Sequence, residues 1–297
     1  MDKRYLVIGF LIAAILALSV MTLALPAGAQ DKTAPAVSPE SADIEIDNGI
    51  IDIDFGELYT FALHDSYWYF RGENVLDDEE PAISYGTNKP VWLGAGTVHQ
   101  YYPPVGSTGT WYSAIISLDL DGDEKDDVNV TRSIMVPGGE KYFVACYCIE
   151  VISDTYLDNL TLFQGVDYDI GPFDKNIGGF DAEGAVYVED REDLRMVAGF
   201  FGNRTPSHHS VDFYDNMWWD IYSGILDDGD YFKGDVGVAL QWDLGDLDYG
   251  EMTCLEVTFF FDDLPAEEAP TLSLTGLVAL VSLLSAIAAV AIVRKRR

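Results

Sequence analysis

The sequence predicts an all-β fold, with a large antiparallel β-sandwich over residues 44–264, an N-terminal signal peptide and a C-terminal transmembrane helix. Two observations predict the sandwich. Short segments of alternating apolar and polar residues recur through this region, and clusters of Gly, Pro, Asn and Asp separate them. This pattern is typical of antiparallel sheets that pack face to face. Because no Pro/Gly/Ser-rich linker divides the region, we expect one large sandwich rather than two small domains.

The N-terminal segment 1–29 is expected to be a secretory signal peptide. A short basic region precedes an apolar run from Tyr5 to Leu25, and Ala27-Gly28-Ala29 fits a small-residue cleavage site. The apolar run is long for a signal peptide, so an uncleaved membrane anchor stays open as the alternative. Residues 30–43 are rich in Pro, Ala and Ser and indicate a flexible lead-in.

The C-terminal segment predicts a single membrane crossing. Residues 265–271 form a linker, and residues 272–293 are uncharged and apolar apart from small polar side chains. As a helix, this stretch would span about 33 Å, which matches a bilayer core. The basic residues 294–297 follow at once and would stay in the cytoplasm. We therefore expect a cell-surface protein, attached to the membrane by this helix, with residues 30–268 outside.

The end of the chain also resembles a known class of tail. The sequence "APTLS", an apolar helix and "RKRR" resemble the C-terminal sorting tails of the IPTL and PEF type. Such tails occur on prokaryotic surface proteins and are processed by exosortase- or archaeosortase-like membrane enzymes. The resemblance covers about the last 29 residues. It implies an archaeal surface protein and a sortase-like processing enzyme as a partner.

The elements follow in chain order. Residues 44–55 read as a hairpin whose turn is Asp47-Asn48-Gly49. The best candidate for a helical turn or short helix is 208–228, because no other long stretch of the ectodomain departs from alternation. Further strand segments are expected within 59–72, 89–102, 110–122, 130–136, 141–153, 160–170, 183–190, 194–202, 236–245 and 252–261.

Two of these segments have a family resemblance. Residues 140–167, with an alternating strand, a polar turn and an "L-x-N-L-T-L" strand, resemble the middle of immunoglobulin-like surface repeats. Residues 240–261 resemble their ending, where a "W-x-L-G-x-L-x-x-G" turn leads into the last strand. Leu244 and Leu247 flank this predicted turn, and Gly250 supplies the bend. The resemblance implies a sandwich and says nothing of activity.

The charge excludes one class of partner. The chain has 17 basic and 50 acidic residues, but six of the basic ones and only Asp2 among the acidic ones lie at the two ends. Residues 30–268 therefore hold 11 basic and 49 acidic residues, a net charge of −38. Such a field repels phosphates, so we expect no nucleic-acid partner. It favours solubility, cation binding or life at high salt.

An acidic loop predicts a structural calcium ion. Asp119, Asp121, Asp123 and Asp127 occupy loop positions 1, 3, 5 and 9, and Lys125 offers its backbone carbonyl at position 7. Calcium takes six to eight oxygen ligands, which acids at alternate positions of a tight loop can supply. The spacing resembles the calcium loops of integrin-type and thrombospondin-type modules. The alternative is a solvated acidic turn.

Two kinds of modification are predicted for an exported chain. Cys146 and Cys148 share one face of a strand, so one of them could form a disulfide with Cys254. Buried free thiols are the alternative. N-glycosylation sequons begin at Asn129, Asn159 and Asn203.

No catalytic set stands out in the sequence. Asp167 and Asp169 could form a glycosidase pair, and the adjacent His208 and His209 could bind a metal, although neighbours on a strand face opposite sides. Tryptophans could stack on sugars or fill the core; these are Trp68, Trp111, Trp218 and Trp219. We therefore expect a non-enzymatic envelope, adhesion or matrix protein that contacts surface glycans or envelope proteins. The alternative is a carbohydrate-active ectodomain, either a glycan-binding module or a glycoside hydrolase.

Overall fold

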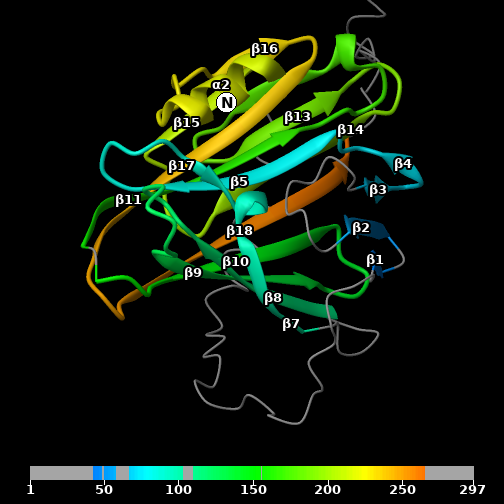
Figure 1. The fold of residues 1–297 in the computed structure, drawn as a ribbon. Coiled ribbons are helices and arrows are strands. Elements are labelled where there is room, and N and C mark those ends of the chain that lie inside the picture. The colour runs from blue at the N-terminus through cyan, green and yellow to red at the C-terminus, as the bar shows by residue number, and fades with distance from the viewer. Residues whose placement is uncertain (1–42, 49, 58–66, 103–109, 155, 265–297) are drawn as a thin grey trace, which may run out of the picture. The chain divides into compact units, whose positions relative to one another are not determined.

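The computed structural model describes residues 43–48, 50–57, 67–102, 110–154 and 156–264 (Figure 1). Within these ranges the chain is mostly strand, and its strands pair antiparallel in three sheets, which confirms the all-β, antiparallel prediction. The described residues, the last of which is Leu264, form one compact unit. The predicted signal peptide and transmembrane helix lie outside the described residues. None of the described helices is long and apolar enough to span a membrane.

The largest sheet has nine strands in the order β16-β12-β13-β14-β18-β10-β9-β8-β7. Its members are β7 (Thr97–Tyr102), β8 (Thr110–Leu118), β9 (Val128–Val136), β10 (Tyr142–Val151), β12 (Ile177–Phe180), β13 (Val186–Asp190), β14 (Met196–Gly202), β16 (Tyr231–Lys233) and β18 (Met252–Asp263). The alternation read from the sequence has a direct cause here. Along β10, Phe143, Ala145, Tyr147 and Ile149 are fully buried, while the residues between them are partly exposed. An antiparallel sheet with one face on the core gives this pattern.

The second sheet has five strands in the order β15-β17-β11-β5-β6. They are β5 (Asp78–Ser84), β6 (Val91–Trp92), β11 (Leu157–Asp167), β15 (His208–Phe213) and β17 (Val236–Leu247). The main core lies between this sheet and the nine-stranded one, with Leu162 and Val166 from β11 and Phe143 and Phe259 from the larger sheet in one apolar cluster. The predicted sandwich is therefore present, and it exceeds a seven-stranded immunoglobulin-like unit.

Helix α2 (Tyr214–Ser223) covers the outer face of the five-stranded sheet (Figure 1). Met217 and Ile221 pack on Phe163 and on small residues of neighbouring strands. Gly165 permits this approach, because a Cβ there would lie 2.4 Å from the ring of Trp218. The helix falls within the stretch 208–228 that the sequence singled out, but the first residues of that stretch form strand β15 instead.

A small four-stranded sheet completes the fold. Strands β1 (Asp43–Asp47) and β2 (Ile51–Glu57) form the predicted hairpin, followed by β3 (Tyr67–Phe70) and β4 (Glu73–Asn74). From β3, the fully buried Trp68 meets Phe143 edge to face, with ring centroids 5.0 Å apart. Two 3-10 turns, η1 (Leu93–Ala95) and η2 (Phe173–Lys175), lie in connections.

Candidate functional site

Carboxylates gather at one end of the five-stranded sheet. Asp167 is the last residue of β11 and lies opposite Asp78 of β5 and Gly237 of β17. Asp169 follows it by two residues, and Asp235 stands just before β17. One carboxylate oxygen from each of Asp167, Asp169 and Asp235 lies within 4.8 Å of the other two. These three residues are called the Asp167 group below.

The surroundings of the Asp167 group disfavour three full negative charges. Asp167 is only 3% exposed, and its Oδ1 has no hydrogen-bond partner. Burial, followed by the nearby carboxylates of Asp169, Asp235 and Asp77, raises the pKa of Asp167 to about 8. Burial and neighbouring carboxylates likewise raise the pKa of Asp169 to about 6 and raise the pKa of Asp235. Chemically, such a group can retain a proton near neutral pH or bind a cation.

An exposed aromatic pair lies on the same helix that begins at the Asp167 group. The backbone N–H of Tyr214, the first residue of α2, donates to the carbonyl of Asp235 at 3.3 Å. Further along α2, Trp219 is 65% exposed and Tyr222 is 41% exposed. Their rings meet edge to face with centroids 5.6 Å apart. At a rise of about 1.5 Å per residue, these two residues lie about 8 and 12 Å from the helix start.

Contacts from neighbouring segments orient the aromatic pair. Lys89 Nζ donates to Tyr222 Oη at 2.8 Å and lies 4.1 Å from the centre of that ring. Trp218 turns toward the sheet and meets Trp92 edge to face, with centroids 5.9 Å apart. Of the named tryptophans whose side chains the structure describes, Trp219 is exposed to solvent, whereas Trp68 is in the core. The side chain of Trp111 lies outside the described part of the structure.

The predicted calcium loop joins β8 to β9. One carboxylate oxygen from each of Asp119, Asp121 and Asp127 lies within 4.8 Å of the other two. Asp123 is not part of this group, and its carboxylate pairs with Lys125 Nζ at 3.0 Å instead.

The loop also closes on itself. The carboxylate of Asp119 accepts backbone N–H bonds from Gly122 and Glu124, both at 2.7 Å. Burial acts to raise the pKa of Asp119, but these backbone bonds outweigh it and lower the pKa. Asp127 Oδ2 accepts the backbone N–H of Leu120 at 2.9 Å. Three of the predicted ligands therefore converge, in a turn that internal hydrogen bonds hold together.

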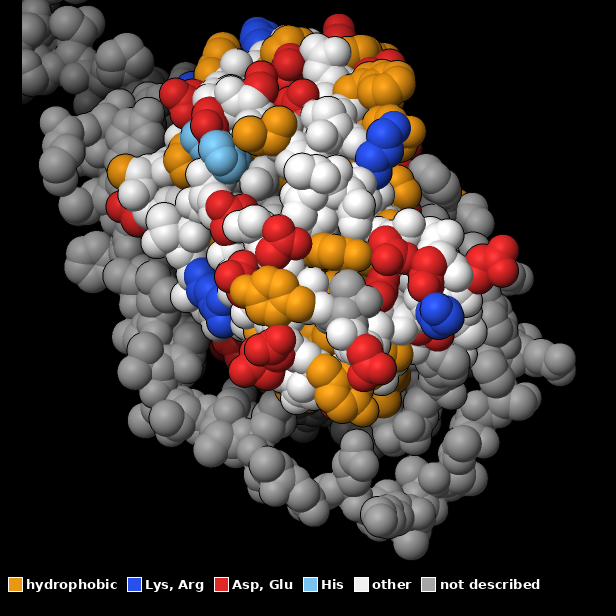
Figure 2. Space-filling view, turned by 60° about the vertical axis from the view of Figure 1, so that its left-hand side comes forward, with side chains coloured by type: hydrophobic (Ala, Val, Ile, Leu, Met, Phe, Trp, Pro, Cys, Tyr) orange, Lys and Arg blue, Asp and Glu red, His pale blue; other side chains and the backbone are white. Residues whose placement is uncertain are grey.

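The two histidines pair with carboxylates, and both lie near Asp228, with His209 Nδ1 3.4 Å from Asp228 Oδ1. On β15, His208 Nδ1 lies 3.0 Å from Asp228 Oδ2, and His209 Nε2 lies 2.9 Å from Asp230 Oδ1. The His209 ring also stacks on Phe180, with centroids 3.7 Å apart. Figure 2 shows the wider setting of this side of the molecule, where red carboxylates are numerous and blue lysines and arginines are few.

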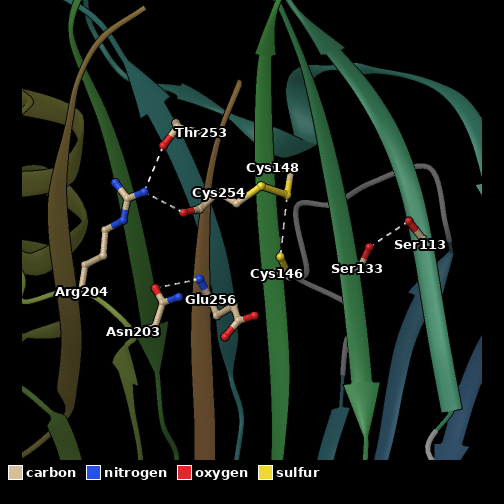
Figure 3. Close-up of a disulfide and its surroundings, with 9 residues drawn as sticks. All are labelled: Ser113, Ser133, Cys146, Cys148, Asn203, Arg204, Thr253, Cys254 and Glu256. Atoms are coloured by element: carbon tan, nitrogen blue, oxygen red, sulfur yellow. Dashed lines mark hydrogen bonds between the residues drawn. A yellow bond between two sulfur atoms is a disulfide. The ribbon is translucent and has the colours of Figure 1, made fainter. Parts of the chain in front are cut away.

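The outer face of the nine-stranded sheet has a disulfide between Cys148 and Cys254 (Figure 3). The two residues face each other across β10 and β18. Cys146 stays a thiol, with its Sγ 3.9 Å from that of Cys148. Burial, and then the charge of Glu256, raises the pKa of Cys146 to about 11.

The asparagines of the three sequons differ in their contacts. Asn129 Oδ1 accepts from Ser117 Oγ at 2.6 Å, and Asn203 Oδ1 accepts the backbone N–H of Glu256 at 3.2 Å. Asn159 is exposed and adopts a left-handed backbone with φ of 50°.

Comparisons with known proteins describe the fold. No protein-family model matches the chain. A Synechocystis protein, Slr1438, matches 78% of this chain and 98% of its own, at 7% identity and a TM-score of 0.50. A protein described as an aldose 1-epimerase from Escherichia coli K12 matches 75% of this chain and 99% of its own, at 10% identity and a TM-score of 0.48. A protein described as a kojibiose phosphorylase from the human microbiome matches 80% of this chain, at 12% identity and a TM-score of 0.44. This chain spans only 29% of the length of that protein. At these identities, the likeness concerns the fold alone.

The comparison corrects one prediction. From the sequence we expected a non-enzymatic protein. That prediction is wrong, because the solved structures similar to this chain include proteins described as carbohydrate-processing enzymes, a phosphorylase and an epimerase. The sequence signal for the alternative was the pair Asp167 and Asp169. Nothing in the sequence indicated that Asp235 joins the pair, because it lies far from Asp167 and Asp169 in the chain.

Proposed function

We propose that the described region is a carbohydrate-active ectodomain that binds glycans on the outer face of helix α2. The observation that carries the proposal is the exposed pair of Trp219 and Tyr222. Large aromatic rings offer apolar surface to the C–H faces of a sugar, and exposed ones leave that surface unused in the free protein. Lys89 adds a hydrogen-bond donor at the edge of the pair. The net negative charge of the chain favours neutral glycans over acidic ones.

The Asp167 group is the candidate reaction centre for this activity. It lies at the start of the helix that carries the aromatic pair, so a sugar chain of two or three units could reach from one to the other. Carboxylates act on glycosidic bonds as acid, base or nucleophile, or hold a cation that polarises a sugar oxygen. Buried carboxylates at the end of a binding face support a role in glycan processing as well as in binding.

Glycan binding is tested with the full-length protein in detergent. Neutral oligosaccharides are titrated by calorimetry and screened on a glycan array. Trp219→Ala should weaken binding at least tenfold and Tyr222→Ala should weaken it less, because Tyr222 is the less exposed ring. Tyr249→Ala, which removes another exposed aromatic far along the chain, is the matched control. If all three variants bind like the parent, glycans do not bind at α2.

Processing is tested separately by incubating the same glycans with the protein and following products by mass spectrometry and reducing-end NMR. Asp169→Asn should abolish product formation while Trp219→Ala reduces it. Binding without any product from the parent would leave a glycan-binding module.

The cellular setting is a second part of the proposal. We propose that the chain is exported and anchored with its ectodomain outside, supported by the cleavage pattern near Ala29 and the apolar, basic C-terminal segment. Processing by a sortase-like enzyme and glycosylation at the three sequons belong to the same setting. Protease added to intact cells should remove the ectodomain. Full protection of residues 30–268 would contradict this placement.

The acidic loop is proposed as a structural calcium site. The convergence of Asp119, Asp121 and Asp127 supports it, and the affinity expected for extracellular modules is about 10⁻⁴ to 10⁻³ M.

A further inference from the structure

We propose that Asp167, Asp169 and Asp235 form a second divalent-cation site, separate from the acidic loop between β8 and β9. The site joins the end of β11 to the residue before β17, so a bound ion would link neighbouring strands of the five-stranded sheet. The proposal does not depend on glycan activity, because its test measures metal binding directly.

The first observation is geometric. The three carboxylate oxygens lie within 4.8 Å of one another. Two oxygens that bind one calcium ion at 2.3–2.6 Å can be at most about 5 Å apart, whereas magnesium at 2.0–2.1 Å reaches only about 4 Å. Three oxygens from different parts of the chain are therefore close enough for one calcium ion to bind all of them after small side-chain adjustments.

The second observation is independent of the clustering. Asp167 is 3% exposed, and its Oδ1 is buried without a hydrogen-bond partner. Leaving a buried acceptor unsatisfied costs about 1–3 kcal/mol, and more for a charged one. A cation beside Asp169 and Asp235 would supply the missing partner for this oxygen.

The acidic residues beside the Asp167 group also favour a bound cation. Asp78 lies directly opposite Asp167 in the pairing of β5 with β11, and the backbone N–H of Asp77 donates to the carbonyl of Asp167 at 3.0 Å. A divalent ion offsets several of these charges at once, which no single lysine or arginine could do. Calcium is the better fit than magnesium, because it accepts irregular oxygen geometry.

The test must separate this site from the acidic loop. Full-length protein in detergent is stripped with EDTA, and calcium is added while binding is followed by calorimetry and the melting temperature by scanning fluorimetry. Asp121→Ala serves as the background, because it removes the loop site. In that background we expect one remaining calcium site, a rise in melting temperature with calcium, and a smaller rise with magnesium.

Asp167→Asn discriminates a cation ligand from a residue with a purely structural role. The amide keeps the shape of the side chain but removes the charge that repels its neighbours. In EDTA, the variant should melt at the same temperature as its background or at a higher one. Calcium should no longer bind to it or raise its melting temperature. Asp235→Asn, in a half-buried position, should also lose the calcium response. The proposal is overturned if Asp121→Ala alone removes all calcium binding, or if calcium still binds both asparagine variants.

Discussion

Arg132 Nη2 lies 2.9 Å from Glu79 Oε1, and both side chains are fully buried between the two large sheets. Arg132 belongs to β9 and Glu79 to β5, so this ion pair joins the layers of the sandwich. Gln164 Nε2 also donates to Glu79 Oε1 at 2.6 Å, and Gln164 Oε1 accepts from Tyr147 Oη at 2.8 Å. The charges are tolerated in the interior because each has hydrogen-bonded partners.

Breaking this pair should strongly destabilise the fold. Glu79→Gln leaves the Arg132 guanidinium buried without a counter-charge, so we expect a loss of about 3–5 kcal/mol in the free energy of unfolding. Lys141→Met is the matched control, since it breaks the half-exposed pair with Asp262 and should cost no more than about 1 kcal/mol. Urea denaturation followed by tryptophan fluorescence measures both. Equal, small losses would show that the buried pair does not hold the layers together.

Glu80 should make stability depend on pH in an unusual direction. Burial, and then the charges of Asp78 and Glu79, raises the pKa of Glu80 from 4.5 to about 8. The folded state therefore binds the proton of Glu80 more tightly than the unfolded chain does. The stability that this proton contributes is fully present below pH 4.5 and is lost as the pH rises through about 8.

Glu80→Gln should remove this fall in stability between pH 4.5 and about 8. The neutral amide cannot lose a proton, so at pH 9 the variant should be more stable than the parent by on the order of 1–3 kcal/mol, while at pH 5 the two should differ little. Denaturation series at the two pH values, both in EDTA, test this. A constant difference across the range would refute the raised pKa.

The sequence predicted the strands whose alternation is set by a single buried face. Segments such as 141–153 appear as predicted, because one face of β10 packs on the core and the other meets solvent. Strand β5 was not predicted, because its first three residues are acidic and show no apolar alternation. Glu79 and Pro81 are buried there, and the partner that makes this possible, Arg132, is 53 residues away. No local pattern shows such a pair.

The same limit applies to the candidate site. The sequence showed Asp167 and Asp169 because they are two apart, but the burial that sets their chemistry comes from the fold. Asp235 joins them only through the pairing of β11 with β17. The aromatic pair was half predicted: Trp218 and Trp219 are adjacent in sequence, yet the helix turns one toward the sheet and leaves the other exposed.

The disulfide should leave one thiol that reacts slowly. The unfolded, unreduced chain should show one free thiol in a thiol-counting assay, because only Cys146 is unbridged. In the folded protein, the pKa of about 11 keeps Cys146 mostly as the thiol, so its alkylation should be slow at pH 8 and should accelerate toward pH 11. Three thiols in the unreduced chain would mean that the bridge does not form.

Removing the bridge should cost stability in proportion to the loop that it closes. Cys148 and Cys254 are 106 residues apart, and the chain-entropy model gives roughly 4–5 kcal/mol for a loop of this length. Cys148→Ser should therefore lower the denaturation midpoint markedly, whereas Cys146→Ser should change it little. The two serine variants differ only in whether the bridge is lost, so similar midpoints would contradict a stabilising role.

Calcium at the acidic loop should stabilise the protein in a way that generic salt cannot copy. An ion that binds only the folded state raises stability by mass action. On the Asp167→Asn background, which removes the second proposed site, millimolar calcium should still raise the melting temperature, and Asp121→Ala should abolish that rise. Asp123→Ala should have a smaller effect, because Asp123 pairs with Lys125 and lies outside the converging group. Magnesium should do less than calcium, because it demands tighter octahedral geometry.

A merely acidic surface predicts screening that is equal for any salt at matched ionic strength and indifferent to Asp121. If sodium chloride stabilises as well as calcium does, and the Asp121→Ala protein responds like its background, the loop is a solvated acidic turn.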